Sequence, residues 1–193
     1  VYKRQAVPTD ELYGVGIWNA DSLGNHRVIV SVDKPADAVL ATIDWRRRDL
    51  NPEAKNLIVV DAATGERITN VCRFTIDRER GEVVFQPQTV PGEYYIYYLK
   101  NVMSGSPYYP TVNYPAFENT ASADWVKKNK LSGKKAPALP AAKVVQFQAI
   151  NELNSFYPME VIATSNETAR LLKEHPGEKY ILFTEAVSYT HLR

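Results

Sequence analysis

The stretch AVLATIDW, residues 38–45, decides the class of fold. Its odd-numbered positions are all apolar, whereas threonine and aspartate occupy two of the even-numbered positions between them. A period of two residues is typical of a β-strand that buries one face and exposes the other. The stretch therefore predicts a strand that lies on a core, and not a helix.

Further runs of β-branched, aromatic and other apolar residues lie on both sides of this strand, and turn residues separate them. They cover residues 12–18, 26–32, 57–60, 67–76, 82–86 and 94–99. No window of this region has the 3.6-residue period of an amphipathic helix. Short strands spaced in this way predict a mainly β fold, an Ig-like antiparallel β-sandwich over residues 6–100.

The side chains expected in the core are apolar residues at the inward positions of these strands. They are Val39, Ile43, Val59, Phe74, Ile76, Val84 and Ile96. Burial of one such side chain stabilises the fold by about 1.5–3 kcal/mol. Cys72 is the single cysteine of the chain and stands among apolar residues, so we expect it to pack as a small hydrophobic side chain.

The composition changes after residue 100. Residues 101–142 are rich in proline and tyrosine and predict a linker with a short helix over residues 121–130, for which Thr120 is the expected N-cap. Residues 143–186 contain three further apolar runs, at 144–150, 159–163 and 180–183. They predict the beginning of a following β-rich domain.

The two ends of the chain differ from the rest. Residues 1–5, VYKRQ, and residues 187–193, VSYTHLR, resemble the translation products of sequencing-adapter DNA. We treat both as adapter-derived scars and leave them out of the reasoning about the fold. The expectation that follows is a fragment of a longer natural protein, truncated at both ends and without its signal peptide.

Charge and motifs exclude several classes of function. The 193 residues carry 23 lysines and arginines against 22 acidic residues, and this balance argues against a protein built to bind nucleic acid. No run of 18 apolar residues predicts a membrane span. The three histidines lack the spacing of metal ligands, and the glycines at 14 and 16 do not make a phosphate-binding loop. We expect no cofactor and no metal.

Four residues are candidates for contact with a carbohydrate: Trp45, Arg47, Tyr108 and Tyr109. A tryptophan ring could stack on a sugar face while an arginine donates two hydrogen bonds to hydroxyls or to an acidic sugar. The alternative for Trp45 is burial at the end of its strand, with an arginine–aspartate pair that makes the loop rigid. The alternative for Tyr108 and Tyr109, together with Tyr114, is that they attach the linker to the sandwich.

Four longer segments carry a family resemblance. GNHRV at 24–28, IDWRRRD at 43–49, PQTVPGEYY at 87–95 and NSFYPME at 154–160 resemble the N-terminal domain region of glycoside hydrolase family 123-like proteins. The likeness extends over about residues 12–185. It implies a β-sandwich that precedes a (β/α)8-type catalytic barrel.

The resemblance also implies a chemistry that lies elsewhere. Members of the family cleave terminal β-linked N-acetylgalactosamine with retention, using the acetamido group of the substrate as the nucleophile. An aspartate next to a glutamate general acid assists, and this pair belongs to the barrel, downstream of the fragment. Asp10-Glu11 is the only adjacent Asp-Glu here and matches no catalytic motif, so we expect no catalytic residue in the fragment.

The expected function is therefore that of a non-catalytic N-terminal region of a glycoside hydrolase whose parent protein is β-N-acetylgalactosaminidase-like. The expected partners are its own downstream catalytic domain and a glycan, with no nucleic acid. The family implies export to the periplasm or the cell surface. The alternative is a stand-alone carbohydrate-binding or structural β-sandwich module.

Overall fold

The computed structural model describes most of the region in which strands are expected. The described residues are 13–150, apart from Arg46, Arg48, Leu99 and Pro107, together with Ala169, Arg170, Lys173 and Glu174. The strands expected at 159–163 and 180–183, the segment NSFYPME and both end segments lie outside the described residues.

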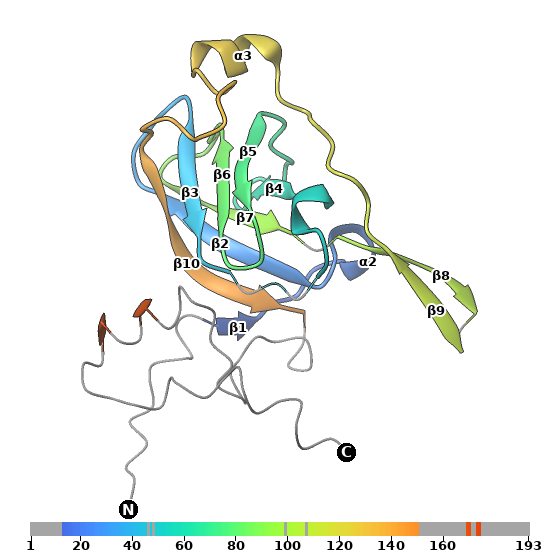
Figure 1. Cartoon of the computed structure of the whole chain (residues 1–193). Helices are drawn as coiled ribbons and strands as arrows, with labels where there is room; N and C mark the ends of the chain where they lie inside the picture. Colours follow the sequence, from blue (N-terminus) through green and yellow to red (C-terminus); the bar gives the residue numbers. More distant parts are fainter. Residues whose placement is uncertain are drawn as a thin grey trace, which may run out of the picture.

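The described part of the chain is mainly β (Figure 1). Its strands are β1 (Tyr13–Val15), β2 (His26–Val32), β3 (Val39–Ile43), β4 (Ile58–Asp61), β5 (Val71–Ile76), β6 (Gly81–Phe85), β7 (Gly92–Tyr97), β8 (Val102–Ser106), β9 (Tyr109–Asn113) and β10 (Ala141–Ala149). Its helices are α2 (Ala20–Leu23), the single 3-10 turn η1 (Pro52–Ala54) and α3 (Ala123–Lys128). The strand positions predicted between residues 12 and 100 are confirmed.

The strands form one curled sheet in the order β4-β7-β2-β10-β3-β6-β5, and β1 pairs with β10 at its side. The sheet curls so that β4, β7 and β2 make one layer and β3, β6 and β5 make the other (Figure 1). The expected arrangement was purely antiparallel, but β10 pairs in parallel with both β1 and β3. Strands β8 and β9 form a separate two-stranded hairpin.

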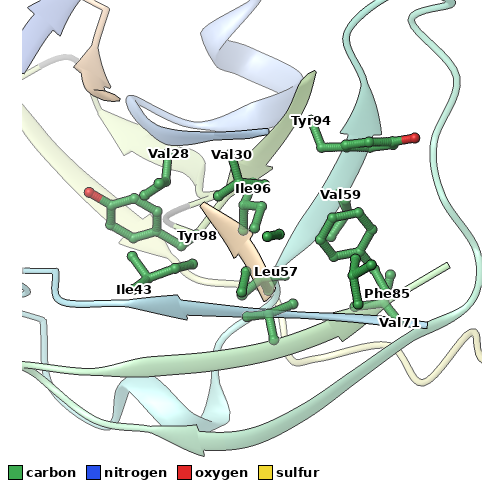
Figure 2. Close-up of a cluster of buried hydrophobic side chains, with 14 of the residues drawn as sticks. Val28, Val30, Ile43, Leu57, Val59, Val71, Phe85, Tyr94, Ile96 and Tyr98 are labelled. Carbon is green, nitrogen blue, oxygen red and sulfur yellow. The ribbon is translucent and has the colours of Figure 1, made fainter. Parts of the chain in front are cut away.

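The main core fills the space between the two layers. Figure 2 shows valines of β2 and aromatic and aliphatic side chains of β7 gathered with Ile43, Phe85 and Val71 of the opposite layer. Of the predicted core residues, all are buried except Phe74, which is partly buried. Val39, Ile43, Val59, Ile76 and Ile96 lie in this main core, whereas Val84 and Phe74 lie in a second cluster on the outer face, because successive residues of a strand point to opposite faces.

Strand β10 joins the layers and differs from its expected place in a following domain. Its first residues pair in parallel with β3, and the rest of the strand pairs antiparallel with β2. The register shifts between Val144 and Gln146, and such a bulge lets one strand bend from one layer into the other. Phe147 and Ala142 of β10 are buried in the main core. The strand expected to open a new domain is thus central to this one.

The expected linker also packs on the domain. Trp125 of α3 and Leu131 are buried against Val84 and the partly buried Cys72, on the outer face of β5 and β6. The predicted helix is confirmed, and Cys72 packs among apolar side chains as expected. The N-cap is Ser122, whose Oγ accepts a hydrogen bond from the backbone of Trp125, and not Thr120, whose hydroxyl donates to Thr69 O at 2.6 Å.

A single carboxylate fastens α3 to the sheet. Asp37 accepts hydrogen bonds from Asn129 Nδ2 at 2.7 Å and from Gln86 Nε2 at 3.0 Å, and it pairs with Lys128. The indole Nε1 of Trp125 donates to the backbone oxygen of Asp37 at 2.9 Å. The hydrogen bond from Asn129 lowers the pKa of Asp37, and the charge of Lys128 adds to that effect.

We predict that folding of this domain requires β10. A chain that ends at residue 140 lacks the strand between β2 and β3 and exposes the core residues that Ala142 and Phe147 cover. A chain that ends at residue 150 keeps the strand, and its core stays covered. Far-ultraviolet circular dichroism and thermal unfolding should give a cooperative transition for the chain ending at 150 and none for the chain ending at 140. A cooperative transition in both would show that β10 belongs to another folding unit.

Candidate functional site

The segment that follows β3 holds the most distinctive candidate residues. Trp45 is 1% exposed, and its indole Nε1 donates to the backbone oxygen of Asp77 at 2.8 Å. Its ring lies against Tyr98, with 5.1 Å between centroids. A Cβ atom at Gly81 would lie 2.5 Å from Cη2 of Trp45, so the ring fits only because glycine begins β6.

Arg47 stacks on this aromatic pair and neutralises a buried carboxylate. Its Nε and Nη2 donate to the two carboxylate oxygens of Asp49 at 2.9 and 2.8 Å. Its guanidinium carbon lies 4.8 Å from the centroid of the Trp45 ring and 5.4 Å from that of Tyr98. Paired hydrogen bonds of this kind fix both side chains in one geometry.

Lys55 completes the cluster. Its Nζ lies 3.0 Å from Oδ2 of Asp49 and also donates to the backbone oxygen of Leu50. Burial raises the pKa of Asp49, but the hydrogen bonds and charges of Arg47 and Lys55 outweigh burial and hold that pKa below its ordinary value. We call Trp45, Arg47, Asp49, Lys55 and Tyr98 the buried charge cluster.

Tyr98 is the most deeply buried aromatic residue of this cluster. It is fully buried, and within the described part of the chain its hydroxyl has no hydrogen-bond partner. Burial raises the pKa of Tyr98 well above its ordinary value. The phenol therefore stays neutral beside the guanidinium of Arg47, to which it offers its ring face.

Tyr108 and Tyr109 lie apart from the cluster, at the tip of the β8–β9 hairpin. They are 88% and 84% exposed, and the hairpin extends away from the curled sheet (Figure 1). The expected alternative, in which the tyrosines attach the linker to the sandwich, is therefore wrong for Tyr108 and Tyr109. At the base of the hairpin, Lys55 Nζ lies 4.5 Å from the ring centroid of Tyr114, which connects the hairpin to the buried charge cluster.

The structure brings Trp45 and Arg47 together and places both inside the protein. In this structure the Trp45 ring is buried and not open to a sugar, and the Nε–Nη2 edge of Arg47 is occupied by the carboxylate of Asp49. The alternative weighed from the sequence, a buried strand-end tryptophan with an arginine–aspartate pair, is confirmed. Carbohydrate contact by the four candidate residues stays a prediction.

Sequence reasoning missed a second arginine-aromatic group. Arg27 of β2 lies 3.8 Å from the ring centroid of Tyr95 and 4.6 Å from that of Trp18. Its Nε donates to Gln148 Oε1 at 2.8 Å, and its Nη1 donates to the hydroxyl of Tyr97 at 3.0 Å. The pairing of β2 with β7 sets Arg27 opposite Tyr97, and this register is what the sequence alone does not show.

The described residues contain neither a metal-ligand group nor a membrane-spanning helix. No group of three or more histidine, cysteine, aspartate or glutamate side chains could hold a metal ion there. No helix in the same part of the chain is long and apolar enough to cross a membrane.

We predict that Arg47→Met destabilises the domain by about 3–5 kcal/mol at neutral pH, because it leaves the buried carboxylate of Asp49 without its main partner. The pKa of Asp49 is lowered in the folded protein, so the pair stabilises above the ordinary aspartate pKa and its contribution is lost as the pH falls through the lowered value. Urea unfolding should therefore show the difference from the unsubstituted chain shrinking toward pH 3.

The matched control is Arg67→Met. Arg67 forms an exposed ion pair with Glu118, in which the side chains are 38% and 59% exposed, so its loss should cost less than about 1 kcal/mol. If both substitutions have equal effects, or if the cost of Arg47→Met does not depend on pH, the pair with Asp49 does not stabilise the fold as described.

Comparison with known proteins gives one family. Residues 16–150 match the family described as glycoside hydrolase 123, N-terminal domain. No curated protein and no solved structure matches the chain. The matched range begins directly after β1 and ends just beyond β10, so it includes the curled sheet, the hairpin and α3. This chain belongs to the family of glycoside hydrolase 123 N-terminal domains.

Proposed function

We propose that this domain is a non-catalytic support for the catalytic part of a glycoside hydrolase, and that the parent enzyme removes terminal N-acetylhexosamine, β-linked N-acetylgalactosamine above all, from glycans. Membership in the family supports the glycoside hydrolase context. The packed core between the two layers and the projecting hairpin support a bracing role, in which we propose that the hairpin contacts the catalytic domain.

The observation that carries the non-catalytic role is the state of the buried carboxylates. Glycoside hydrolysis needs acidic groups that face the substrate from one cleft. Asp49 is held by Arg47 and Lys55. Asp61 is fully buried and accepts hydrogen bonds from the backbone nitrogens of Ala63, Thr64 and Thr89, which lower its pKa although burial raises it. In the described part of the chain, both buried carboxylates thus stabilise the fold.

The direct test is hydrolysis of p-nitrophenyl β-N-acetylgalactosaminide. We expect no release of p-nitrophenol by the 193-residue chain above the rate in buffer, and release by a longer natural protein that carries the same domain. Measurable turnover by the chain itself would overturn the non-catalytic role. If the longer protein cleaves no N-acetylhexosaminide at all, the proposed substrate class is wrong.

A stand-alone carbohydrate-binding module is the second candidate, and the exposure of Tyr108 and Tyr109 favours it. Aromatic rings on a solvent-exposed hairpin can stack on sugars. The burial of Trp45 removes the third ring that such a surface would have used. Both proposals include export to the periplasm or the cell surface, where the protein would encounter glycans.

We predict that the Tyr108→Ala/Tyr109→Ala double substitution changes the free energy of unfolding by less than about 0.5 kcal/mol, because both rings are in solvent. Tyr114→Ala is the matched tyrosine control and should cost about 0.5–1 kcal/mol through the lost contact with Lys55. Calorimetric titration with N-acetylgalactosamine oligosaccharides should show no binding to the chain. Glycan binding that the double substitution abolishes would establish the binding module instead.

A further inference from the structure

The two faces of the β8–β9 hairpin carry different side chains. Residues that lie directly opposite each other in an antiparallel pair point to the same face, so the register places Met103 and Val112 together on one face. Gly105, two positions further along β8, adds no side chain to that face. The opposite face mixes two apolar residues with four hydroxyl or amide side chains: Val102, Tyr109, Ser104, Ser106, Thr111 and Asn113.

The hairpin is exposed and carries no charge. Met103 is 64% and Val112 is 41% exposed, and neither belongs to a hydrophobic cluster of the described residues. The sequence has no lysine, arginine, aspartate or glutamate between Lys100 and Glu118. Both strands of a two-stranded hairpin are edges, and edges that stay in water are usually protected by charged side chains. A hairpin of two strands also needs packing against another element to be stable. These features indicate a hairpin that a partner covers.

The strand pairing shows which partner begins nearby. Strands β7 and β10 both run antiparallel to β2, so both end at the same edge of the sheet, where Tyr97 and Gln148 lie on either side of Arg27. Strand β8 begins shortly after Tyr97, and the family match ends at residue 150, directly after β10. Adjacent strands are about 4.8 Å apart, so the end of β10 lies about 10 Å from the strand that leads into the hairpin. A domain that follows residue 150 therefore starts within reach of the hairpin.

We propose that the face of the hairpin with Met103 and Val112 docks on an uncharged, apolar surface of the catalytic domain that follows residue 150 in the parent enzyme. This inference rests on the proposed function, which supplies the catalytic domain, and it adds the face that makes the contact. Burial of the opposite face would remove water from Ser104 and Asn113, whereas burial of the Met103 face removes water from no hydroxyl, amide or charge. The face with Ser104 and Asn113 stays in water.

Hydrogen–deuterium exchange of the hairpin amides tests the docking. In the 193-residue chain we expect fast exchange over residues 102–113, and in the longer natural protein we expect exchange slower by about tenfold or more, because local opening then requires undocking. Met103→Lys in the longer protein should return the exchange to the rate of the 193-residue chain. The matched control Ser104→Lys places the same charge on the next residue and the opposite face, and it should leave the protection intact.

Folding of the substituted chains is measured separately. Met103 is in solvent, so Met103→Lys should leave the unfolding temperature of the 193-residue chain unchanged. Docking on the catalytic domain is overturned if the hairpin amides exchange equally fast in both proteins, or if the two lysine substitutions have the same effect. It is also overturned if sedimentation velocity shows a dimer of the 193-residue chain that Met103→Lys makes monomeric, because a second copy of the chain then covers this face.

Hydrolysis of p-nitrophenyl β-N-acetylgalactosaminide by the same longer protein separates this inference from the proposed function. Hydrolysis with an unprotected hairpin overturns the docking and leaves the proposed substrate class intact. A protected hairpin without hydrolysis establishes the docking and shows that the proposed substrate class is wrong.

Discussion

The fold depends on the pairing of β10 with two strands that belong to different layers. Antiparallel hydrogen bonds tie β10 to β2, and parallel ones tie it to β3. Without this strand the two layers would each have an unpaired edge, and unpaired edges expose backbone donors and acceptors. The bulge near Val144 lets one continuous strand serve both layers, so the curled sheet closes around a single core.

Buried and half-buried polar groups hold the helix and the loops that pack around the core. Asp37 holds α3 on the outer face of the sheet, Asp61 holds the turn at the end of β4, and Asp49 holds the loop that follows β3. Each of these carboxylates has several donors, as buried or half-buried charges require. The arginines likewise have several partners each, because Arg27 and Arg47 are both stacked on aromatic rings and both hydrogen-bonded. Arg73 also stacks on a ring, that of Phe117, and donates to Lys55 O, but its buried Nε has no hydrogen-bond partner among the described residues.

Local patterns were sufficient to predict the strands and parts of the core. The alternation over residues 38–45 is that of β3, and the run of tyrosines in β7 divides into inward Tyr94 and outward Tyr95 as a strand requires. Partners along the sheet could not be predicted, because pairing depends on contacts between residues far apart in the chain. Residues 144–150 read as a strand, but nothing in them indicates that their neighbour is β2 and not a strand further on.

The candidate site shows the same division. An exposed sugar-stacking tryptophan and a buried one have the same sequence signature, and Gly81 and Asp77, which accommodate the ring, lie more than thirty residues away. The exposed tyrosines of the hairpin could be anticipated as candidates, whereas the aromatic surroundings of Arg27 depend on the β2–β7 register. The surroundings of Arg73 had no signal in the sequence, because its partners Lys55 and Phe117 lie far from it along the chain.

The parallel pairing of β1 with β10 also has a mechanical meaning. Tyr13 lies opposite Phe147 and Val15 opposite Ala149, so the first and the last strand of the curled sheet lie side by side although they are far apart in the sequence. A force that pulls the start of β1 away from the end of β10 acts along the strands. The hydrogen bonds between β1 and β10 then share the load together and do not open one after another, so a domain attached at these two points resists tension in shear.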